Sequence, residues 1–212
     1  AILESENIFV MDEKRALSQD IRPLQLVILN LMPLKEETEL QILRALSNTP
    51  LQVDCTFLML STYVSKNTSA SHINKFYVNF EDIRKHKYDG MIITGAPVEN
   101  MEFEDVDYWE ELKSIMDWST THVHSTLHIC WGAQAGLYFH YGIPKYPREK
   151  KLNGVYSHKV LHHKVPLVRG LDDYVMCPHS RYTEVRSEDI RKHEDLNILA
   201  ESEEAGVLLV VN

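Results

Sequence analysis

The sequence predicts an α/β protein with a doubly wound, mostly parallel sheet and a small antiparallel extension. Between residues 24 and 141, continuous apolar runs alternate with amphipathic segments four times. Apolar runs of this kind are typical of parallel strands covered on both faces, and the alternation with helices favours a doubly wound sheet. After residue 142 the pattern changes to short strand-like runs separated by polar loops, which indicates the extension.

Each element of the sheet has its own signal. The expected strands are 24–31, 51–60, 88–94 and 125–130. A helix over 36–46 follows from leucines at helical spacing and acidic residues in the first turn. A second helix is expected over 73–83, a third around 109–116, and a fourth from 131 to 141, where residues 142–144 (GIP) break it.

The ends of the chain carry weaker signals. Residues 1–23 are expected to wrap the domain, with 7–11 as their one strand-like patch. The runs 154–161, 174–177, 196–201 and 206–211 are expected to form the antiparallel extension and the return to the main sheet. We interpret residues 1–212 as a single domain that looks truncated at both ends, since it starts at Ala1 and stops inside an apolar run.

Composition excludes several classes of protein. No apolar run reaches the roughly 20 residues that span a bilayer. The net charge of −9 argues against a nucleic-acid partner. Three scattered cysteines form no disulfide framework and no secretory signal opens the chain, so we expect a cytoplasmic protein. Neither histidines nor cysteines fall at metal-ligand spacing, so no metal site is expected.

Residues 125–136 (STLHICWGAQAG) are the segment around which the rest of the chain is organised. They predict a strand ending in Cys130, a tight turn, and a helix opened by small residues. A thiol at such a turn lies at the positive end of the helix, where backbone N–H groups favour the thiolate. Cys130 is therefore the candidate nucleophile, against the alternative that it is a buried structural cysteine.

Thiolate attack on a carbonyl creates an oxyanion that needs N–H donors. In doubly wound sheets, sites form beyond the carboxyl ends of the strands. The residue after the nucleophile, Trp131, and the loop 95–98 (GAPV) follow neighbouring strands. The backbone amides of Trp131 and Val98 are the expected oxyanion hole, although a Gly-Ala-Pro sequence also makes an ordinary turn.

Several blocks of sequence resemble the homoserine O-acyltransferases of methionine biosynthesis, whose fold is similar to that of class I glutamine amidotransferases. The resemblance covers essentially the whole chain and rests on ENIFVM (6–11), ILNLMP (28–33), NKFY (74–77), TGAP (94–97), CWGAQA (130–135) and PHSRY (178–182). It implies that Cys130 accepts the acyl group and that Lys35 lies beside the acyl site. It further implies that Lys151 and Ser180 hold substrate.

The same resemblance implies which acyl donor is used. The position two residues after the Gly-Ala-Pro turn, Glu99, faces the acyl chain in the family, with glutamate associated with acetyl donors and glycine with succinyl donors. Physically, an ionised Glu99 would repel the carboxylate of a succinyl group and fill the space it needs. The alternative is that Glu99 points to solvent, as most glutamates do.

Part of the family's pattern is not present in residues 1–212. The resemblance places the general-base histidine, its partner glutamate and an arginine for the substrate carboxylate beyond Asn212. Among the internal histidines, His179 beside Ser180 is the best substitute, although it is not assigned as the base. The basic cluster 145–151 reads as a solvated loop, or as a contact to coenzyme A phosphates or to the homoserine carboxylate.

The resulting hypothesis is a homoserine O-acetyltransferase that works through an acyl-cysteine. Its partners are L-homoserine and acetyl-CoA, the latter as co-substrate, with no cofactor, and a homodimer is left open. Alternatives are a succinyltransferase, a glutamine amidotransferase or cysteine hydrolase, and a truncated binding domain without turnover. Glutaminase activity without coenzyme A would favour the amidotransferase or hydrolase. Ligand binding with no labelled Cys130 would favour the binding domain.

Overall fold

The computed structural model describes residues 2–62 and 68–212, and the chain divides into two compact units. The first unit comprises residues 1–98 and 103–133, and the second comprises 99–102 and 134–212. The predicted nucleophile turn belongs to the first unit.

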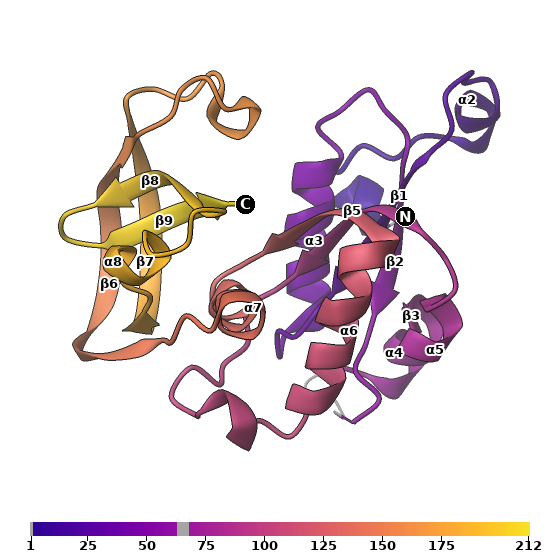
Figure 1. The fold of residues 1–212 in the computed structure, drawn as a ribbon. Helices are drawn as coiled ribbons and strands as arrows, with labels where there is room; N and C mark the ends of the chain where they lie inside the picture. The colour runs from indigo at the N-terminus through magenta and orange to yellow at the C-terminus, as the bar shows by residue number, and fades with distance from the viewer. Residues whose placement is uncertain (1, 63–67) are drawn as a thin grey trace. The chain divides into compact units, whose positions relative to one another are not determined.

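The first unit is built on a five-stranded parallel sheet in the order β3-β2-β1-β4-β5 (Figure 1). The chain runs from β1 outward to β2 and β3, then crosses back to the other side of β1 for β4 and β5. This reversal between β1 and β4 is the point at which doubly wound sheets bind ligands. The predicted fold class is confirmed. The strands are β1 (Leu24–Leu29), β2 (Val53–Leu58), β3 (Tyr77–Val78), β4 (Tyr88–Ile93) and β5 (Val123–His128).

Burial explains why the central strands are continuous apolar runs. Val27, Ile28 and Leu29 at the end of β1 are fully buried. A strand in the middle of a sheet that is covered on both faces has no solvent side, so polar residues are excluded from consecutive positions. The carboxyl end of β1 is therefore anchored firmly, and the loop after it starts from a fixed point.

The helices of the first unit follow most of the sequence predictions. The predicted helix 36–46 is α3. The prediction that residues 7–11 are strand-like is wrong, because they lie between the short helices α1 and α2 and form no strand. The predicted fourth helix is α7, which begins in the first unit and continues into the second. The helices are α1 (Ile2–Ser5), α2 (Glu13–Leu17), α3 (Lys35–Leu46), α4 (Ala70–Phe76), α5 (Phe80–Ile83), η1 (Phe103–Asp105), α6 (Trp109–His122) and α7 (Trp131–Tyr141).

The single helix predicted over 73–83 is wrong. It is divided into α4 and α5 by the two-residue strand β3, where Tyr77 pairs with Phe57 of β2. Asn79 then starts α5 with a capping box, in which its backbone N–H donates to Asp82. The apolar residues at helical spacing come from two helices that are separated by this strand.

The second unit is a four-stranded antiparallel sheet in the order β7-β6-β8-β9. This confirms the antiparallel extension, but the predicted return to the main sheet is wrong. Strand β8 pairs with the far end of β6, at Lys159 and Val160, and β9 pairs with β8. The basic cluster 145–151 lies mostly within β6 and is not a loop. The elements are β6 (Tyr146–Val160), η2 (Pro166–Val168), β7 (Tyr174–Glu184), α8 (Ser187–Ile190), β8 (Asn197–Ser202) and β9 (Gly206–Val211).

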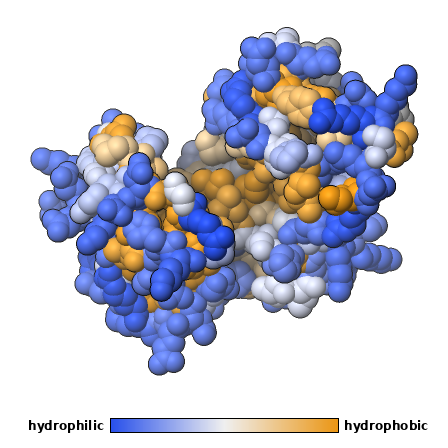
Figure 2. All heavy atoms as spheres, turned by 90° about the horizontal axis from the view of Figure 1, so that it is seen from above, coloured by the Kyte–Doolittle hydropathy of each residue, from blue (hydrophilic) through white to orange (hydrophobic). Residues whose placement is uncertain are grey.

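Figure 2 draws one face of the molecule, on which hydrophilic residues cover most of the surface and hydrophobic residues lie between them. The second unit has a core of its own. Among the described residues, this core includes one buried cluster of Ile143, Ile190, Leu196 and Ile198 and another of Val160, Val168 and Leu199. None of the helices in the described residues has the length and apolar character that crossing a membrane requires.

Candidate active site

Cys130 lies at the sharp turn between β5 and α7. Its φ of 54° is in the left-handed region, which is rare for a residue with a side chain. The strand ends at His128 and the helix begins at Trp131, so the prediction that the strand itself extends to Cys130 is wrong by two residues. The Cys130 side chain is exposed, and a strained, exposed residue at a strand-to-helix turn is the geometry of a nucleophile elbow.

Glycine at 132 is required by the packing of this turn. A β-carbon there would lie 2.6 Å from the carbonyl oxygen of Thr94 and 3.0 Å from that of Ile93. Both are backbone atoms at the end of β4, so they have no room to move away. The absence of a side chain lets the first turn of α7 rest directly on β4, and this places Cys130 at the carboxyl edge of the sheet.

The loop after β4 lies against the nucleophile. A β-carbon on Gly95 would lie 3.2 Å from the β-carbon of Cys130 and 3.6 Å from its sulfur. The buried Thr94 fixes this loop, because its hydroxyl accepts a hydrogen bond of 2.8 Å from the Leu31 N–H and donates one of 3.1 Å to the Gly95 carbonyl. The structure therefore brings the loop 95–98 and Cys130 together, as the sequence predicts.

Trp131 is the first residue of α7, and N–H groups in the first turn of a helix have no acceptor within the helix. Its indole is almost fully buried against Phe103 and Tyr108, with ring centroids 5.8 and 6.3 Å away. This packing holds the backbone of Trp131 beside Cys130. The roles of Trp131 and Val98 as oxyanion donors stay predictions.

Lys35 is the first residue of α3, the helix that follows β1 after the loop 30–34, and it is only 4% exposed. Its ammonium donates a hydrogen bond to the carbonyl oxygen of Asn30. Burial lowers the pKa of Lys35 to about 8, and the negative charge of Glu39 opposes this shift. A lysine with this pKa is still mostly cationic at neutral pH but gives up its proton in mildly alkaline solution.

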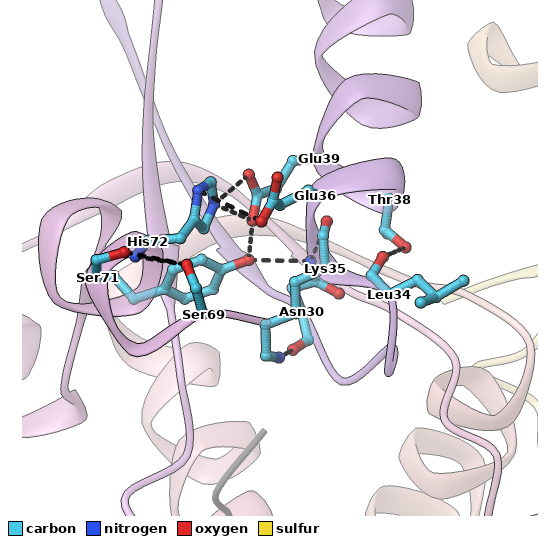
Figure 3. Close-up of polar contacts among 10 residues, drawn as sticks. Asn30, Leu34, Lys35, Glu36, Thr38, Glu39, Ser69, Ser71 and His72 are labelled. Carbon is cyan, nitrogen blue, oxygen red and sulfur yellow. Dashed lines mark hydrogen bonds and ion pairs between the residues drawn. The ribbon is translucent and has the colours of Figure 1, made fainter. Parts of the chain in front are cut away.

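A polar cluster around Lys35 was not predicted from the sequence. Glu39 accepts a 2.5 Å hydrogen bond from the hydroxyl of Tyr77 and lies 2.9 Å from Nε2 of His72, whereas Glu36 lies 3.9 Å from the other ring nitrogen (Figure 3). The spacing of Lys35 and Glu39 by four residues on one helix was a signal that could have found part of it.

The second unit gathers three of the predicted substrate-side residues. The carboxylate of Glu99 accepts a hydrogen bond of 3.3 Å from the Tyr182 N–H, and the backbone carbonyl of Glu99 accepts one of 3.0 Å from Lys145. The ammonium of Lys151 lies 5.1 Å from the centre of the Tyr182 ring. The exposed Ser180 is two residues before Tyr182 on β7. Sequence reasoning gave neither Tyr182 nor Lys145 a role of its own, although Tyr182 ends the block PHSRY (178–182) and Lys145 opens the basic cluster 145–151.

Comparison with known proteins decides the family. A protein-family model described as homoserine O-succinyltransferase matches residues 1–212. The chain belongs to the homoserine O-succinyltransferase family. Relatives named homoserine O-acetyltransferase include one from Lachnoclostridium phytofermentans, which is 66% identical over 99% of this chain and 70% of its own length. Another, from Lachnospira eligens, is 63% identical over 100% of this chain and 68% of its own length.

The fold of this family member is also that of glutamine amidotransferases. A solved glutamine amidotransferase from Thermotoga maritima has a TM-score of 0.58 over 90% of this chain and 72% of its own, at 11% sequence identity. At this identity the likeness concerns the fold alone. It confirms the predicted class I glutamine amidotransferase-like architecture.

The other two cysteines of this family member are poor nucleophiles. Burial raises the pKa of Cys55 to about 11 and also raises that of Cys177 above its ordinary value. Their thiols stay protonated at neutral pH, whereas the thiolate is the form that attacks a carbonyl. The environment therefore favours Cys130 as the reactive thiol.

His179 does not acquire the properties of a general base. Its Nε2 lies 2.9 Å from that of the buried His158. Burial, reinforced by Arg181, His158 and Arg148, lowers the pKa of His179 to about 4. A base of this pKa accepts a proton only weakly at neutral pH.

No group of three or more metal-ligating side chains that could hold an ion occurs among the described residues.

Proposed function

We propose that the protein transfers an acetyl group from acetyl-CoA to the hydroxyl of L-homoserine through an S-acetyl intermediate on Cys130. The observation that carries this proposal is the elbow itself, with an exposed cysteine at a φ of 54°, directly before α7 and against the backbone of Gly95. The names of the relatives at 63–66% identity support the choice of substrates.

In the first half-reaction the thiolate of Cys130 forms a bond to the acetyl carbon of acetyl-CoA. The electron pair of the carbonyl moves to oxygen, and backbone N–H groups of Trp131 and Val98 are the proposed donors to this oxyanion. When the carbonyl re-forms, the bond between the acetyl carbon and the coenzyme A sulfur breaks. Coenzyme A leaves as a thiol after taking up a proton, and the acetyl group stays on Cys130.

In the second half-reaction the homoserine hydroxyl oxygen attacks the S-acetyl carbon. The new C–O bond forms, the bond to the Cys130 sulfur breaks, and the hydroxyl proton passes to a general base. The resemblance assigns that base to a histidine outside residues 1–212, and the low pKa of His179 supports this assignment over an internal substitute. Lys151 and Ser180 are the proposed contacts to homoserine.

Glu99 is the proposed selector of the acetyl donor. Its side chain is half-buried and its carboxylate is held by the Tyr182 N–H, so it does not simply point to solvent. A succinyl carboxylate beside it would meet a like charge. The basic residues 145–151 are the proposed contact to coenzyme A phosphates. The reaction needs no resident cofactor, because acetyl-CoA enters as a co-substrate.

The test is mass analysis of the full-length protein after separate incubation with acetyl-CoA, succinyl-CoA and glutamine, followed by addition of homoserine. We expect an acetyl adduct that maps to Cys130 and disappears when homoserine is added, with parallel lines in double-reciprocal plots. Glutamine hydrolysis without coenzyme A would instead establish an amidotransferase. A succinyl adduct formed in preference to the acetyl adduct would overturn the donor assignment.

A further inference from the structure

The ammonium of Lys35 has a small set of contacts that fix its position. Its hydrogen bond goes to the Asn30 carbonyl, and the ring of Tyr77 lies 5.5 Å from the nitrogen. A buried ammonium has lost most of its water, so these contacts determine where the charge lies.

The side chain of Asn30 is held by hydrogen bonds at both its amide nitrogen and its amide oxygen. It is 1% exposed, and its amide nitrogen donates to the Lys35 carbonyl at 3.2 Å and to the Tyr77 hydroxyl at 3.1 Å. Its amide oxygen accepts from the Met32 N–H at 3.2 Å. The position of the carbonyl that receives Lys35 therefore depends on Tyr77.

Tyr77 takes its orientation from Glu39. Its hydroxyl accepts from Asn30 and donates to the Glu39 carboxylate at 2.5 Å, so both its donor and acceptor roles are assigned. Burial, followed by the hydrogen bond to Glu39, raises the pKa of Tyr77 well above its usual value. The hydroxyl stays protonated over any working pH, which keeps this hydrogen bond in one direction.

The cluster is joined to the nucleophile by contacts within one unit. The residue after Asn30 is Leu31, whose N–H donates to the Thr94 hydroxyl. Thr94 is followed by Gly95, whose backbone lies against Cys130. A change in the position of the chain at Asn30 is therefore passed to the loop that borders the thiol through closely packed groups.

Glu39 also supplies the charge that balances Lys35. It lies one helical turn after Lys35 and is 8% exposed, whereas Glu36, the other carboxylate facing the cluster, has a side chain that is 60% exposed. Among the described residues, the ionisable groups in contact with this pair are Glu36 on the same helix, His72 of α4 and Tyr77 of β3. Attraction between buried charges is screened less than attraction at the surface.

We propose that Glu39 and Tyr77 are positioning residues for acyl transfer, which hold the Lys35 ammonium through Asn30 at the carboxyl edge of the sheet that carries Cys130. This inference rests on the proposed function, which gives Lys35 its place beside the acyl site. Neither residue touches the reacting atoms. They act through the location of Lys35 and the persistence of its charge.

The test compares three variants of the full-length protein. Glu39→Gln keeps the shape and removes the charge, and Tyr77→Phe keeps the ring and removes the hydroxyl. Tyr88→Phe is the matched control. It removes a tyrosine hydroxyl that bonds to Thr56 of β2, and Tyr88 lies at the amino end of β4, away from the carboxyl edge. The titration of Lys35 is followed by NMR with 13C-labelled lysine, with its signal assigned from a Lys35→Met variant.

We expect Glu39→Gln to lower the titration midpoint of Lys35 and to move the alkaline limb of kcat to lower pH. Both Glu39→Gln and Tyr77→Phe should reduce kcat by about tenfold, with a smaller change in KM, because a displaced group costs rate more than binding. Tyr88→Phe should match the wild type in midpoint and pH profile.

The two readouts separate the inference from the function on which it rests. If the wild type transfers no acyl group while Glu39→Gln still lowers the Lys35 midpoint, the proposed function fails, and what stands is that Glu39 sustains the charge of Lys35. If the wild type is active but both variants match Tyr88→Phe in kcat, the inference is overturned whatever the midpoint does. Circular dichroism of each variant confirms that the compared proteins are folded.

Discussion

The backbone of Gly95 lies directly against the side chain of Cys130, so that a β-carbon at position 95 would lie 3.2 Å from the β-carbon of the cysteine. Contacts this close are tighter than ordinary van der Waals packing. Because Cys130 already has a left-handed backbone conformation, its side chain has little freedom to adapt. The residue type at 95 therefore controls the placement of the thiol.

The variant Gly95→Ala should slow acetylation of Cys130 by about tenfold or more, because a small displacement of a nucleophile is costly in rate. Stopped acylation reactions analysed by mass spectrometry measure this rate. Gly170→Ala is the control, since Gly170 has a φ of 88° and open space around it, so its variant adds backbone strain within the second unit and no new side-chain contact. Equal acylation rates in the wild type and Gly95→Ala would show that the thiol tolerates the contact.

Iodoacetamide at neutral pH should modify Cys130 before Cys55 and Cys177. Burial keeps the pKa of both other thiols high, at about 11 for Cys55, whereas Cys130 is exposed at the start of α7. Peptide mapping over time gives the three rates, and Cys130→Ser should remove the fast one. Faster modification of Cys55 or Cys177 than of Cys130 would contradict the assignment of the nucleophile.

Two substitutions at Glu99 separate charge from volume in donor selection. Glu99→Gln keeps an oxygen that accepts the Tyr182 N–H but removes the charge, and Glu99→Gly removes both. If like-charge repulsion excludes succinyl groups, both variants should raise kcat/KM for succinyl-CoA relative to acetyl-CoA. If volume excludes them, only Glu99→Gly should do so. A ratio that neither variant changes would show that Glu99 does not select the donor.

His179→Gln should leave acetyl transfer at neutral pH within about twofold of the wild type, since a histidine with a pKa near 4 contributes little as a base. The low pKa also predicts an effect on folding. The unfolded chain binds a proton at its ordinary pKa of about 6.5, so acidification from pH 6.5 to 4 favours unfolding.

Urea denaturation of the wild type and His179→Gln between pH 7 and 4 measures this second effect. The free energy of unfolding should fall less on acidification in the variant, because one proton-linked contribution to unfolding is gone. Identical pH dependence in both proteins would mean that the pKa of His179 is not depressed. A large loss of transfer at neutral pH would instead identify it as the missing base.

The sequence by itself determined the elements whose signals are local. A continuous apolar run predicts a strand covered on both faces, and β1 shows why, since Val27, Ile28 and Leu29 are fully buried. The elbow at Cys130 could also be predicted, because a strand, a cysteine, a small residue and a helix within twelve residues already specify a tight turn with no space for a side chain at Gly132.

Only the tertiary structure decided which distant residues meet. Tyr77 interrupts a helical pattern because its partners are Phe57 and Glu39, and Glu99 is held by the Tyr182 N–H, 83 residues further along the chain. In the second sheet, β8 pairs with β6 and β9 pairs with β8, and neither strand joins the main sheet. Periodicity records which face of an element is apolar, but not which partner covers it, so contacts between distant segments appear only when the chain is folded.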